Sequence, residues 1–366
     1  MVYLDYNATT PVLPEVFEVM KPFFCEHWAN PSSPYLFAKE SSDAIEEARQ
    51  HVAQLIGAQP EEIFFTSCAT ESNQTILHGT AGKVATSAVE HSSILEFLKN
   101  RGDALFIPVN SEGLLDLERL DSDLSKGQVA LASFIWANNE TGVISPIQEI
   151  AAICDKHGVS LHSDAVQAAG KVVIDVAHTT VNYLSLNAHK IYGPKGVGAV
   201  YIRKGSPYKP LLIGSQERTR RGGTEAVPLI VGFGKAAEMA RTDLDKRSHL
   251  SSQIRDKLEQ AVLKNIPGAY INGSRDNRLP NTLNIGFPSI DSDMIVQLLG
   301  KRGIMVSNGS ACKSQAITPS HVLIAMGKSH EAASEALRFS VSHLTKETEI
   351  DTAVSTLKEL VESFSS

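Results

Sequence analysis

A lysine and a carboxylate in the middle of the chain stand where they could act on one ligand. Lys190 follows His189 and precedes a glycine/proline turn over 193–196, after which residues 197–202 are predicted to form a strand. Asp164 comes directly after a strand predicted over 159–162. A lysine amine can form a Schiff base, and a carboxylate can pair with a protonated pyridine nitrogen. The two residues therefore predict a pyridoxal phosphate (PLP) site and chemistry at the α-carbon of an amino acid.

Each of these two residues also has an ordinary interpretation. Most lysines lie at the surface, but Ala188 and Gly193 leave room for a ligand beside Lys190, and burial would lower the pKa of its amine. Asp164 alone would be read as a helix N-cap. With Gln167 one turn further on, it is instead expected to face a cofactor at the end of a strand.

A phosphate-binding segment is predicted over 68–73. Thr70 and Asn73 have the spacing of a capping box at the start of a helix. The backbone N–H groups of such a helix start also bind phosphate dianions, because they point out of the helix and carry its partial positive charge. The two interpretations are compatible.

Three further residues follow predicted strands or lie in polar segments. His91 stands at a strand-to-helix junction, where a planar imidazole could stack on a planar cofactor, although a lone histidine is more often structural. Asn139 precedes Gly142 in a turn-like segment and could donate to a ring hydroxyl. Cys312 has small polar neighbours, and Lys313 would favour its thiolate, so a reactive cysteine is predicted there.

Composition sets the limits within which these residues act. The chain has 366 residues, 42% of them hydrophobic, and a net charge of −7. This length favours two domains, and the charge gives no reason to expect nucleic acid as a partner. No apolar run reaches the ~20 residues that cross a bilayer, so no membrane partner is expected. The four scattered cysteines suggest neither a metal site nor disulfides and suit a reducing cytoplasm, and the strand-like start predicts no signal peptide.

Strands and helices alternate through the first two thirds of the chain. The predicted strands cover 63–66, 83–86, 105–109, 129–135 and 159–162, and the predicted helices cover 70–77, 92–99 and 147–157. This order predicts a mostly parallel sheet covered by helices, with ligands at the carboxyl ends of its strands. Beyond about residue 245, helices (248–263, 292–299 and 350–362) mix with strands (282–287, 304–307 and around 337–341). We therefore predict a large domain over 12–245 and a smaller α+β domain from 1–11 and 246–366.

Taken together, the motifs resemble the cysteine desulfurases, a branch of the class V aminotransferase family of PLP enzymes. The resemblance runs nearly end to end, through the segments 3–11, 30–33, 69–73, 90–91, 138–140, 164–167, 189–196, 221–224 and 309–312. The segment around Cys312 resembles the nitrogenase-type and housekeeping group that serves iron–sulfur cluster assembly. The resemblance implies the fold type I of PLP-dependent transferases, with a seven-stranded sheet, and a homodimer.

The resemblance also implies a role for each site residue. Lys190 would carry the internal aldimine and move the α-proton, and Asp164 would pair with the ring nitrogen. His91 would stack on the ring and act as an acid–base catalyst. Gln167 and Asn139 would contact the ring oxygen. The phosphate would be held by Ala69, Thr70, Asn187 and His189, and by Thr224 of the partner subunit. Arg338, assisted by Asn30, would bind the carboxylate of L-cysteine. Cys312 would take the substrate sulfur as a persulfide, release alanine and pass the sulfur to an acceptor such as an iron–sulfur scaffold.

Some positions depart from the family pattern. Asn187 stands where the family usually has a phosphate-binding serine, and an amide can still donate. Ala188 replaces a usual glycine, Ser342 and His343 replace a Gly-Arg pair, and Tyr35 stands near a usual histidine. Lys313 alters the cysteine segment, where sulfur acceptors approach. These changes are expected to leave the chemistry unchanged. They leave undetermined which protein accepts the sulfur from Cys312.

Two other functions remain open at this point. The first keeps the fold and changes the reaction, to a selenocysteine or cystine lyase or to an aminotransferase. Cys312 argues against the aminotransferase, because transamination needs no thiol. The second is a non-catalytic sulfur-carrier protein with the same fold, against which the joint presence of Lys190, Asp164, His91 and Arg338 argues.

Overall fold

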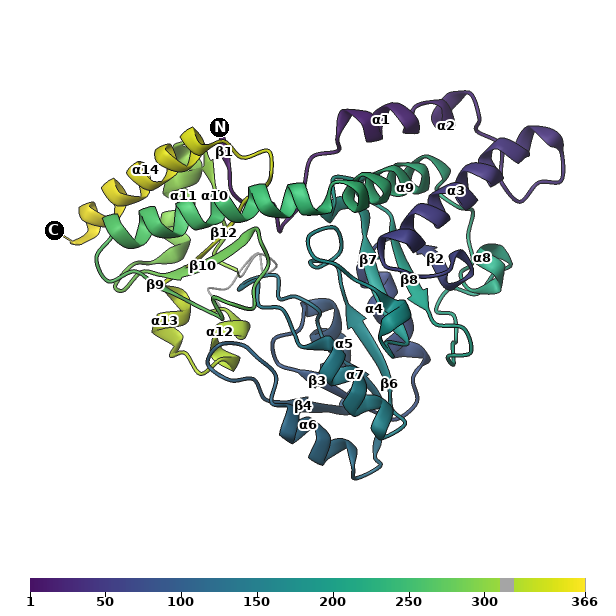
Figure 1. Cartoon of the computed structure of the whole chain (residues 1–366), viewed down its shortest axis with the longest axis horizontal. Coiled ribbons are helices and arrows are strands. Elements are labelled where there is room, and N and C mark those ends of the chain that lie inside the picture. Colours follow the sequence, from purple (N-terminus) through teal and green to yellow (C-terminus); the bar gives the residue numbers. More distant parts are fainter. Residues whose placement is uncertain (310–318, 366) are drawn as a thin grey trace.

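The chain folds into a large sheet-based body and a smaller α+β body that are joined by one long helix (Figure 1). The computed structural model describes residues 1–309 and 319–365. The connecting helix is α10 (Leu244–Asn265). The chain begins in the smaller body and then passes into the larger one, so the smaller body contains both the N-terminal segment and the C-terminal part of the chain. The C-terminal helix α14 (Glu347–Ser365) packs against α10.

The larger body is built on a seven-stranded, mostly parallel sheet, as the sequence predicts. In spatial order its strands are β2 (Ile63–Thr66), β8 (Gly198–Ile202), β7 (Tyr183–Asn187), β6 (Ser160–Asp164), β5 (Val129–Ser133), β3 (Lys83–Ser87) and β4 (Ala104–Ile107). Strand β8 is antiparallel to both of its neighbours, and the remaining pairs are parallel. The carboxyl ends of β3, β5, β6 and β7 therefore meet at one edge, where a ligand site is expected.

Helices cover both faces of this sheet, and successive residues of the central strands β6, β7 and β8 are buried on both faces. In β8, Ala199 and Tyr201 face one hydrophobic core, whereas Val200 and Ile202 face another. The first core is covered by α3 (Lys39–Leu55), α6 (Leu117–Leu124), α7 (Ile147–Lys156) and α9 (Val227–Thr242). The second is covered by α4 (Ala69–Gly79) and α5 (Ser92–Arg101).

The smaller body has its own hydrophobic core. Its elements are β1 (Val2–Tyr3), β9 (Tyr270–Ile271), β10 (Thr282–Gly286), α11 (Ser292–Lys301), β11 (Ile304–Met305), α12 (His321–Ala325), α13 (His330–Ser334) and β12 (Ala336–Ser340). Strand β10 lies between β12 and β9, and β1 pairs in parallel with β11. The separate core, which includes Leu4 and Leu258, supports the predicted division of the chain, whose boundaries stay a prediction.

Two details differ from the sequence prediction. Helix α4 begins at Ala69 with Cys68 as its N-cap, and no side chain caps it, so the prediction of Thr70 as N-cap was wrong. The extended backbone of Cys68 leaves Thr70 inside the first turn. The strand predicted to end at His162 runs on to Asp164, so Asp164 belongs to the sheet itself.

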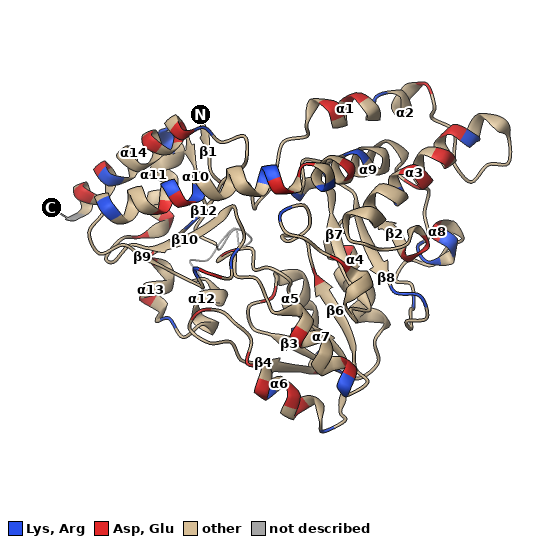
Figure 2. Cartoon of the chain, viewed as in Figure 1, with Lys and Arg blue, Asp and Glu red and all other residues tan. Residues whose placement is uncertain are grey.

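Charged side chains lie mainly on the outer helices. Figure 2 shows acidic and basic residues interspersed along α10 and α14. None of the helices in the described part of the chain is long and apolar enough to cross a membrane.

One buried ion pair fixes the edge of the large sheet. The two guanidinium NH groups of Arg49 in α3 donate to the two carboxylate oxygens of Glu217 at 2.7 and 2.9 Å. Glu217 also accepts from the backbone N–H of Phe65 in β2, and it lies in the short helix α8 (Gln216–Thr219) with a positive φ of 46°. Because both charged groups are buried away from water, the loss of either one would leave the other as an uncompensated buried charge.

Removing one member of this pair is expected to destabilise the fold strongly. We expect Arg49→Ala to cost about 3–5 kcal/mol of unfolding free energy, because it leaves the carboxylate of Glu217 buried without its partner. Arg302→Ala removes an exposed ion pair with Glu359 and is expected to cost less than about 1 kcal/mol. Urea denaturation of both variants checks this, and equal costs would contradict it.

Candidate active site

Most of the predicted site residues line one cavity of about 430 Å³ at the carboxyl edge of the large sheet. Those lining it are Ala69, Thr70, His91, Asn139, Asp164, Gln167, Asn187, His189, Lys190 and Arg338. All but Arg338 come from the large sheet or the segments that follow its strands, whereas Arg338 comes from β12 of the smaller body. The cavity therefore lies where the two bodies meet.

Lys190 stands in the short connection between β7 and β8. It ends the 3-10 turn Ala188–Lys190, and its amine donates to the backbone oxygens of Asn7 and Ala8 at 2.5 and 2.8 Å. Both acceptors belong to the N-terminal segment, so the lysine is oriented by residues far away in the sequence.

Asp164 ends β6 and is almost fully buried. Its two carboxylate oxygens accept from the side-chain amide of Asn73 at 2.7 Å and from the backbone N–H of Val166 at 3.0 Å. Asn73 in turn donates to the hydroxyl of Ser93. These donors hold the carboxylate at one orientation at the cavity wall.

His91 is the N-cap of α5, as its position at a strand-to-helix junction suggests. Its Nδ1 accepts from the backbone N–H of Ser93 at 3.2 Å, which leaves Nε2 to carry the proton of the neutral ring. Burial is the main reason that the pKa of His91 is lowered; Lys190 and His321 lower it further, whereas Asp164 opposes the shift. The ring is therefore uncharged at neutral pH.

A cradle for an anion lies at the start of α4. A side chain at Gly198 would come within 2.7 Å of the backbone of Cys68 and 3.0 Å of that of Ala69, so only glycine allows β8 to approach this helix start. The side-chain oxygen of Asn187 is buried and has no hydrogen-bond partner among the described residues. The imidazole of His189 contacts the hydroxyl of Thr9, and burial together with nearby lysines lowers its pKa to about 4.

Arg338 closes the opposite side of the cavity. Its guanidinium donates to Asp5 at 2.7 Å and to the backbone oxygen of Asn139 at 3.0 Å. Its Nε is buried and has no partner among the described residues. The arginine is thus held in place while one of its donors stays available to an anion.

The side chain of Gln167 is held by hydrogen bonds to Asn7 and Lys171. Its amide nitrogen donates to the backbone oxygen of Asn7 at 2.9 Å, and its oxygen accepts from Lys171 at 2.6 Å. The expected contacts of Gln167 and Asn139 with a ring oxygen stay predictions.

Asn7 is the residue that sequence reasoning missed. It is 1% exposed, and its side chain bonds to Asn139, Thr282, Asn281 and Lys171. Its backbone oxygen accepts from both Lys190 and Gln167. The residue lies within the opening motif 3–11, but its partners are 132 or more residues away, so no local pattern could identify them.

Three predicted residues lie elsewhere. Asn30 is exposed, and its side chain accepts from the backbone N–H of Ser32 in its own turn, so within one chain it does not assist Arg338. Thr224 is exposed and does not line the cavity of its own chain. Cys312 lies outside the described residues.

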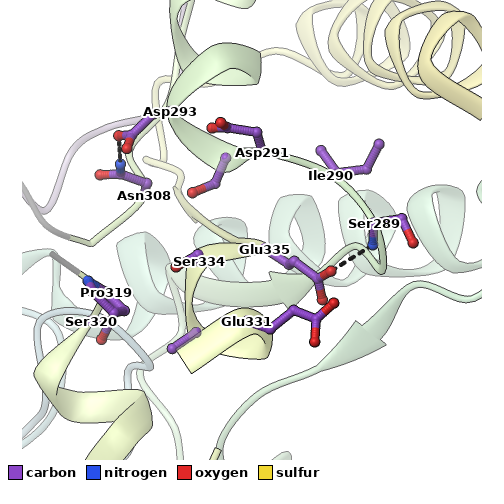
Figure 3. A pocket seen from close by; sticks show the side chains of 12 residues that line it. Ser289, Ile290, Asp291, Asp293, Asn308, Pro319, Ser320, Glu331, Ser334 and Glu335 are labelled. Carbon is purple, nitrogen blue, oxygen red and sulfur yellow. Dashed lines mark hydrogen bonds between the residues drawn. The ribbon is translucent and has the colours of Figure 1, made fainter. Parts of the chain in front are cut away.

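The described residues on either side of the Cys312 segment are anchored near the cavity. Asn308 donates to Asp293, and Ser320 donates to the buried carboxylate of Glu140 at 2.5 Å. Figure 3 shows Ser320 and the hydrogen bond between Asn308 and Asp293 beside a second cavity, whose wall carries the carboxylates of Asp291 and Glu331. A side chain at Gly309 would come within 2.5 Å of Glu140, so this backbone also passes close to the carboxylate.

Comparison with known proteins agrees with this architecture. The family profile described as aminotransferase class-V matches residues 2–352. A relative from Azotobacter vinelandii, the cysteine desulfurase NifS, is 45% identical over 98% of this chain and 92% of its own. A solved NifS-like protein superimposes with a TM-score of 0.92 at 37% identity, covering 99% of each chain. A structure of SspA in complex with cysteine has a TM-score of 0.82 at 35% identity, covering 93% of this chain and 99% of its own.

These matches settle the family. The chain belongs to the class V aminotransferases and, within them, to the cysteine desulfurases, as the sequence motifs suggest.

A buried histidine lies beneath the cavity on the same strand as Asp164. The ring nitrogens of His162 contact the hydroxyls of Ser133 and Ser185, on the two neighbouring strands, at 2.8 and 3.0 Å. Burial lowers the pKa of His162 to about 3. The unfolded chain thus binds a proton at this residue at a higher pH than the folded protein does.

His162 is therefore expected to make stability depend on pH. Its contribution is complete above the unfolded pKa of about 6.5 and falls by about 1.4 kcal/mol per pH unit as the pH drops toward 3. In His162→Gln, whose amide can still bond to a serine, we expect a flatter pH dependence than in the wild type. Urea denaturation of both proteins at pH 6.5 and 5 checks this, and equal slopes would contradict it.

Proposed function

We propose that this protein is a PLP-dependent cysteine desulfurase that converts L-cysteine to L-alanine and takes the sulfur onto Cys312. The observation that supports this most strongly is the convergence of Lys190, Asp164, His91 and Arg338 on one cavity between the two bodies. A lysine, an acid, a neutral ring and an arginine at one site are the groups that such a reaction requires.

The residues present fit the cofactor. The helix start at Ala69 and Thr70 is expected to hold the phosphate, together with Asn187 and His189, because these groups can donate to a dianion. The close approach of β8 to the start of α4 at Gly198 supports this assignment, and the amide nitrogen of Asn187, which lines the same cavity, can donate to the dianion. Bound PLP supplies an electron sink that acidifies the α-carbon of an amino acid joined to it.

The protein's own groups then orient the substrate and move protons. Asp164, fixed by Asn73, is placed to favour a protonated ring nitrogen, and the neutral imidazole of His91 is placed to lie against the ring. Arg338 is expected to bind the substrate carboxylate through its available Nε. Lys190 is expected to take the proton from the α-carbon with its amine.

The sulfur transfer balances without an added oxidant. The thiolate of Cys312 attacks the substrate sulfur, a sulfur–sulfur bond forms, and the bond between that sulfur and Cβ breaks. Cβ keeps the electron pair and takes up a proton, which gives alanine. A reductant or an acceptor thiol, such as that of an iron–sulfur scaffold, then removes the sulfur from Cys312.

A homodimer is part of this proposal. Large apolar side chains are exposed along the first helices and the segment before α8: Phe24 is 54% exposed, Trp28 66%, Leu36 83% and Ile213 90%. Such a surface favours burial against another copy. It also supports the expected role of Thr224, which would complete the phosphate site of the partner subunit. A cytoplasmic location, suggested by the cysteine pattern, belongs to the same proposal.

The role of Cys312 is tested by removing its thiol. We expect Cys312→Ala to bind PLP, with visible absorbance near ~420 nm, and to release no sulfide from L-cysteine in the presence of dithiothreitol. Cys25→Ala, at an exposed cysteine of α2 (Pro22–Cys25), is the control and should retain full activity. Full sulfide release by the Cys312 variant would contradict the formation of a persulfide on Cys312.

The role of Arg338 is tested by a conservative change. Lysine keeps the charge but loses Nε and the planar fork, so Arg338→Lys should raise KM for L-cysteine about 10–100-fold, the equivalent of one or two charge-assisted hydrogen bonds. Steady-state alanine production measures KM, and the visible spectrum controls for PLP binding. An unchanged KM would assign the substrate carboxylate to another group.

A further inference from the structure

Tyr192, two residues after Lys190, has a backbone conformation that a tyrosine rarely adopts. Its φ is 71°, in the left-handed region that glycine adopts without strain. The turn that carries Lys190 is closed around it, because the backbone N–H groups of Ile191 and Gly193 both donate to the oxygen of Ala188 at 3.0 Å. Helical turns that close in this way usually have glycine at the left-handed position. A tyrosine there therefore needs contacts that offset the strain.

The backbone of Tyr192 is held by the N-terminal segment. Its N–H donates to the hydroxyl of Thr10 at 2.8 Å, and its oxygen accepts from the N–H of Leu13 at 3.2 Å. The hydroxyl of Thr10 donates in turn to the backbone oxygen of His189 at 3.0 Å. A glycine could form the same backbone bonds, so these contacts alone do not explain why the residue is a tyrosine.

The side chain of Tyr192 is held by the smaller body and the connecting helix. Its hydroxyl forms a hydrogen bond of 2.5 Å with the hydroxyl of Ser342, which is 1% exposed. The ring of His343 meets the tyrosine ring edge to face, with 4.9 Å between the ring centres, and the guanidinium of Arg247 in α10 lies 5.6 Å from the ring centre. Burial raises the pKa of Tyr192 to about 12, so the hydroxyl keeps its proton at neutral pH.

The hydroxyl contact joins the two sides of the active-site cavity. Ser342 follows β12 and lies four residues after Arg338, whereas Tyr192 lies two residues after Lys190. Ser342 is also a position at which the sequence departs from the family pattern, and a glycine in its place could not form this bond. The hydrogen bond therefore connects the turn of Lys190 directly to the segment that carries Arg338.

We propose that Tyr192 is a positioning residue whose hydroxyl, bonded to Ser342 of the smaller body, keeps the turn of Lys190 in its strained conformation. Without this bond the turn can relax, and the amine of Lys190 then leaves the backbone oxygens of Asn7 and Ala8 that orient it. Because a displacement of about 1 Å can slow a reaction about 100-fold, a small relaxation is enough to affect turnover. The inference deepens the proposed function, on which it rests for the reaction that Lys190 performs.

Hydrogen exchange of the cofactor-free protein tests the contact without any measurement of activity. Tyr192→Phe removes only the hydroxyl, and the exchange of the amides in residues 188–193 is followed by mass spectrometry. We expect exchange to be about fivefold faster than in the wild type, the equivalent of one hydrogen bond between neutral groups. Ser342→Ala should have at least the same effect, since it also loses the bond from the N–H of Leu344. The double variant should exchange no faster than Ser342→Ala, because both changes remove the same bond.

Turnover shows whether the contact positions Lys190. In Tyr192→Phe we expect kcat for alanine production from L-cysteine to fall at least about fivefold and KM to stay within about twofold of the wild-type value, because Arg338 keeps its contacts. Tyr183→Phe is the matched control. The hydroxyl of Tyr183 donates to the backbone oxygen of Pro207 at the opposite end of β7 from Asn187, so its loss should change neither the exchange of residues 188–193 nor kcat.

Thermal unfolding shows whether each variant is folded. Unchanged exchange of residues 188–193 in folded Tyr192→Phe would overturn the proposal. Faster exchange with an unchanged kcat would also overturn it, because the hydroxyl would then have a structural role only. A wild type that forms no alanine from L-cysteine would refute the proposed function instead, and the exchange measurement would still decide whether Tyr192 holds the turn.

Discussion

The structure depends on the hydrogen bonds of one buried asparagine. Asn7 binds Lys190, Gln167 and Lys171 on the side of the large sheet and Thr282 and Asn281 on the side of the smaller body. Because an unsatisfied buried amide costs about 1–3 kcal/mol, these partners fix one another's positions. The relative placement of the two bodies and the orientation of the central lysine thus follow from the same contacts.

This constraint explains why the site lies between the bodies. The sheet places Asp164, Asn187 and Lys190 at one edge, because parallel strands end there together. Arg338 enters from β12, which pairs with β10, and Asp5 and Asn139 hold its guanidinium. The arginine proposed to bind the substrate and the residues proposed to bind the cofactor therefore come from different bodies, and the N-terminal segment contacts both through Asn7 and Asp5.

The sequence predicted the parts that are local. The alternation of strands and helices predicted the mostly parallel sheet, and the residues that follow its strands predicted the cavity wall, because strand ends have a common direction. Helix α9, with Gly232 and Gly234 packed against Met20 and Ala48, was not predicted, since close packing replaces the usual amphipathic pattern. Asn7 also escaped prediction as a functional residue. Its importance arises from contacts between distant segments, and a single sequence does not contain those contacts.

In the proposed mechanism, one chain carries both the lysine that activates the substrate and the cysteine that takes its sulfur. The most direct measurement is a single turnover of the PLP-loaded protein with L-cysteine in the absence of reductant, followed by mass spectrometry of the protein and analysis of the amino-acid product. We expect the peptide containing Cys312 to gain one sulfur atom and alanine to form in equal amount. Formation of pyruvate and free sulfide, with no gain of mass at Cys312, would contradict this mechanism.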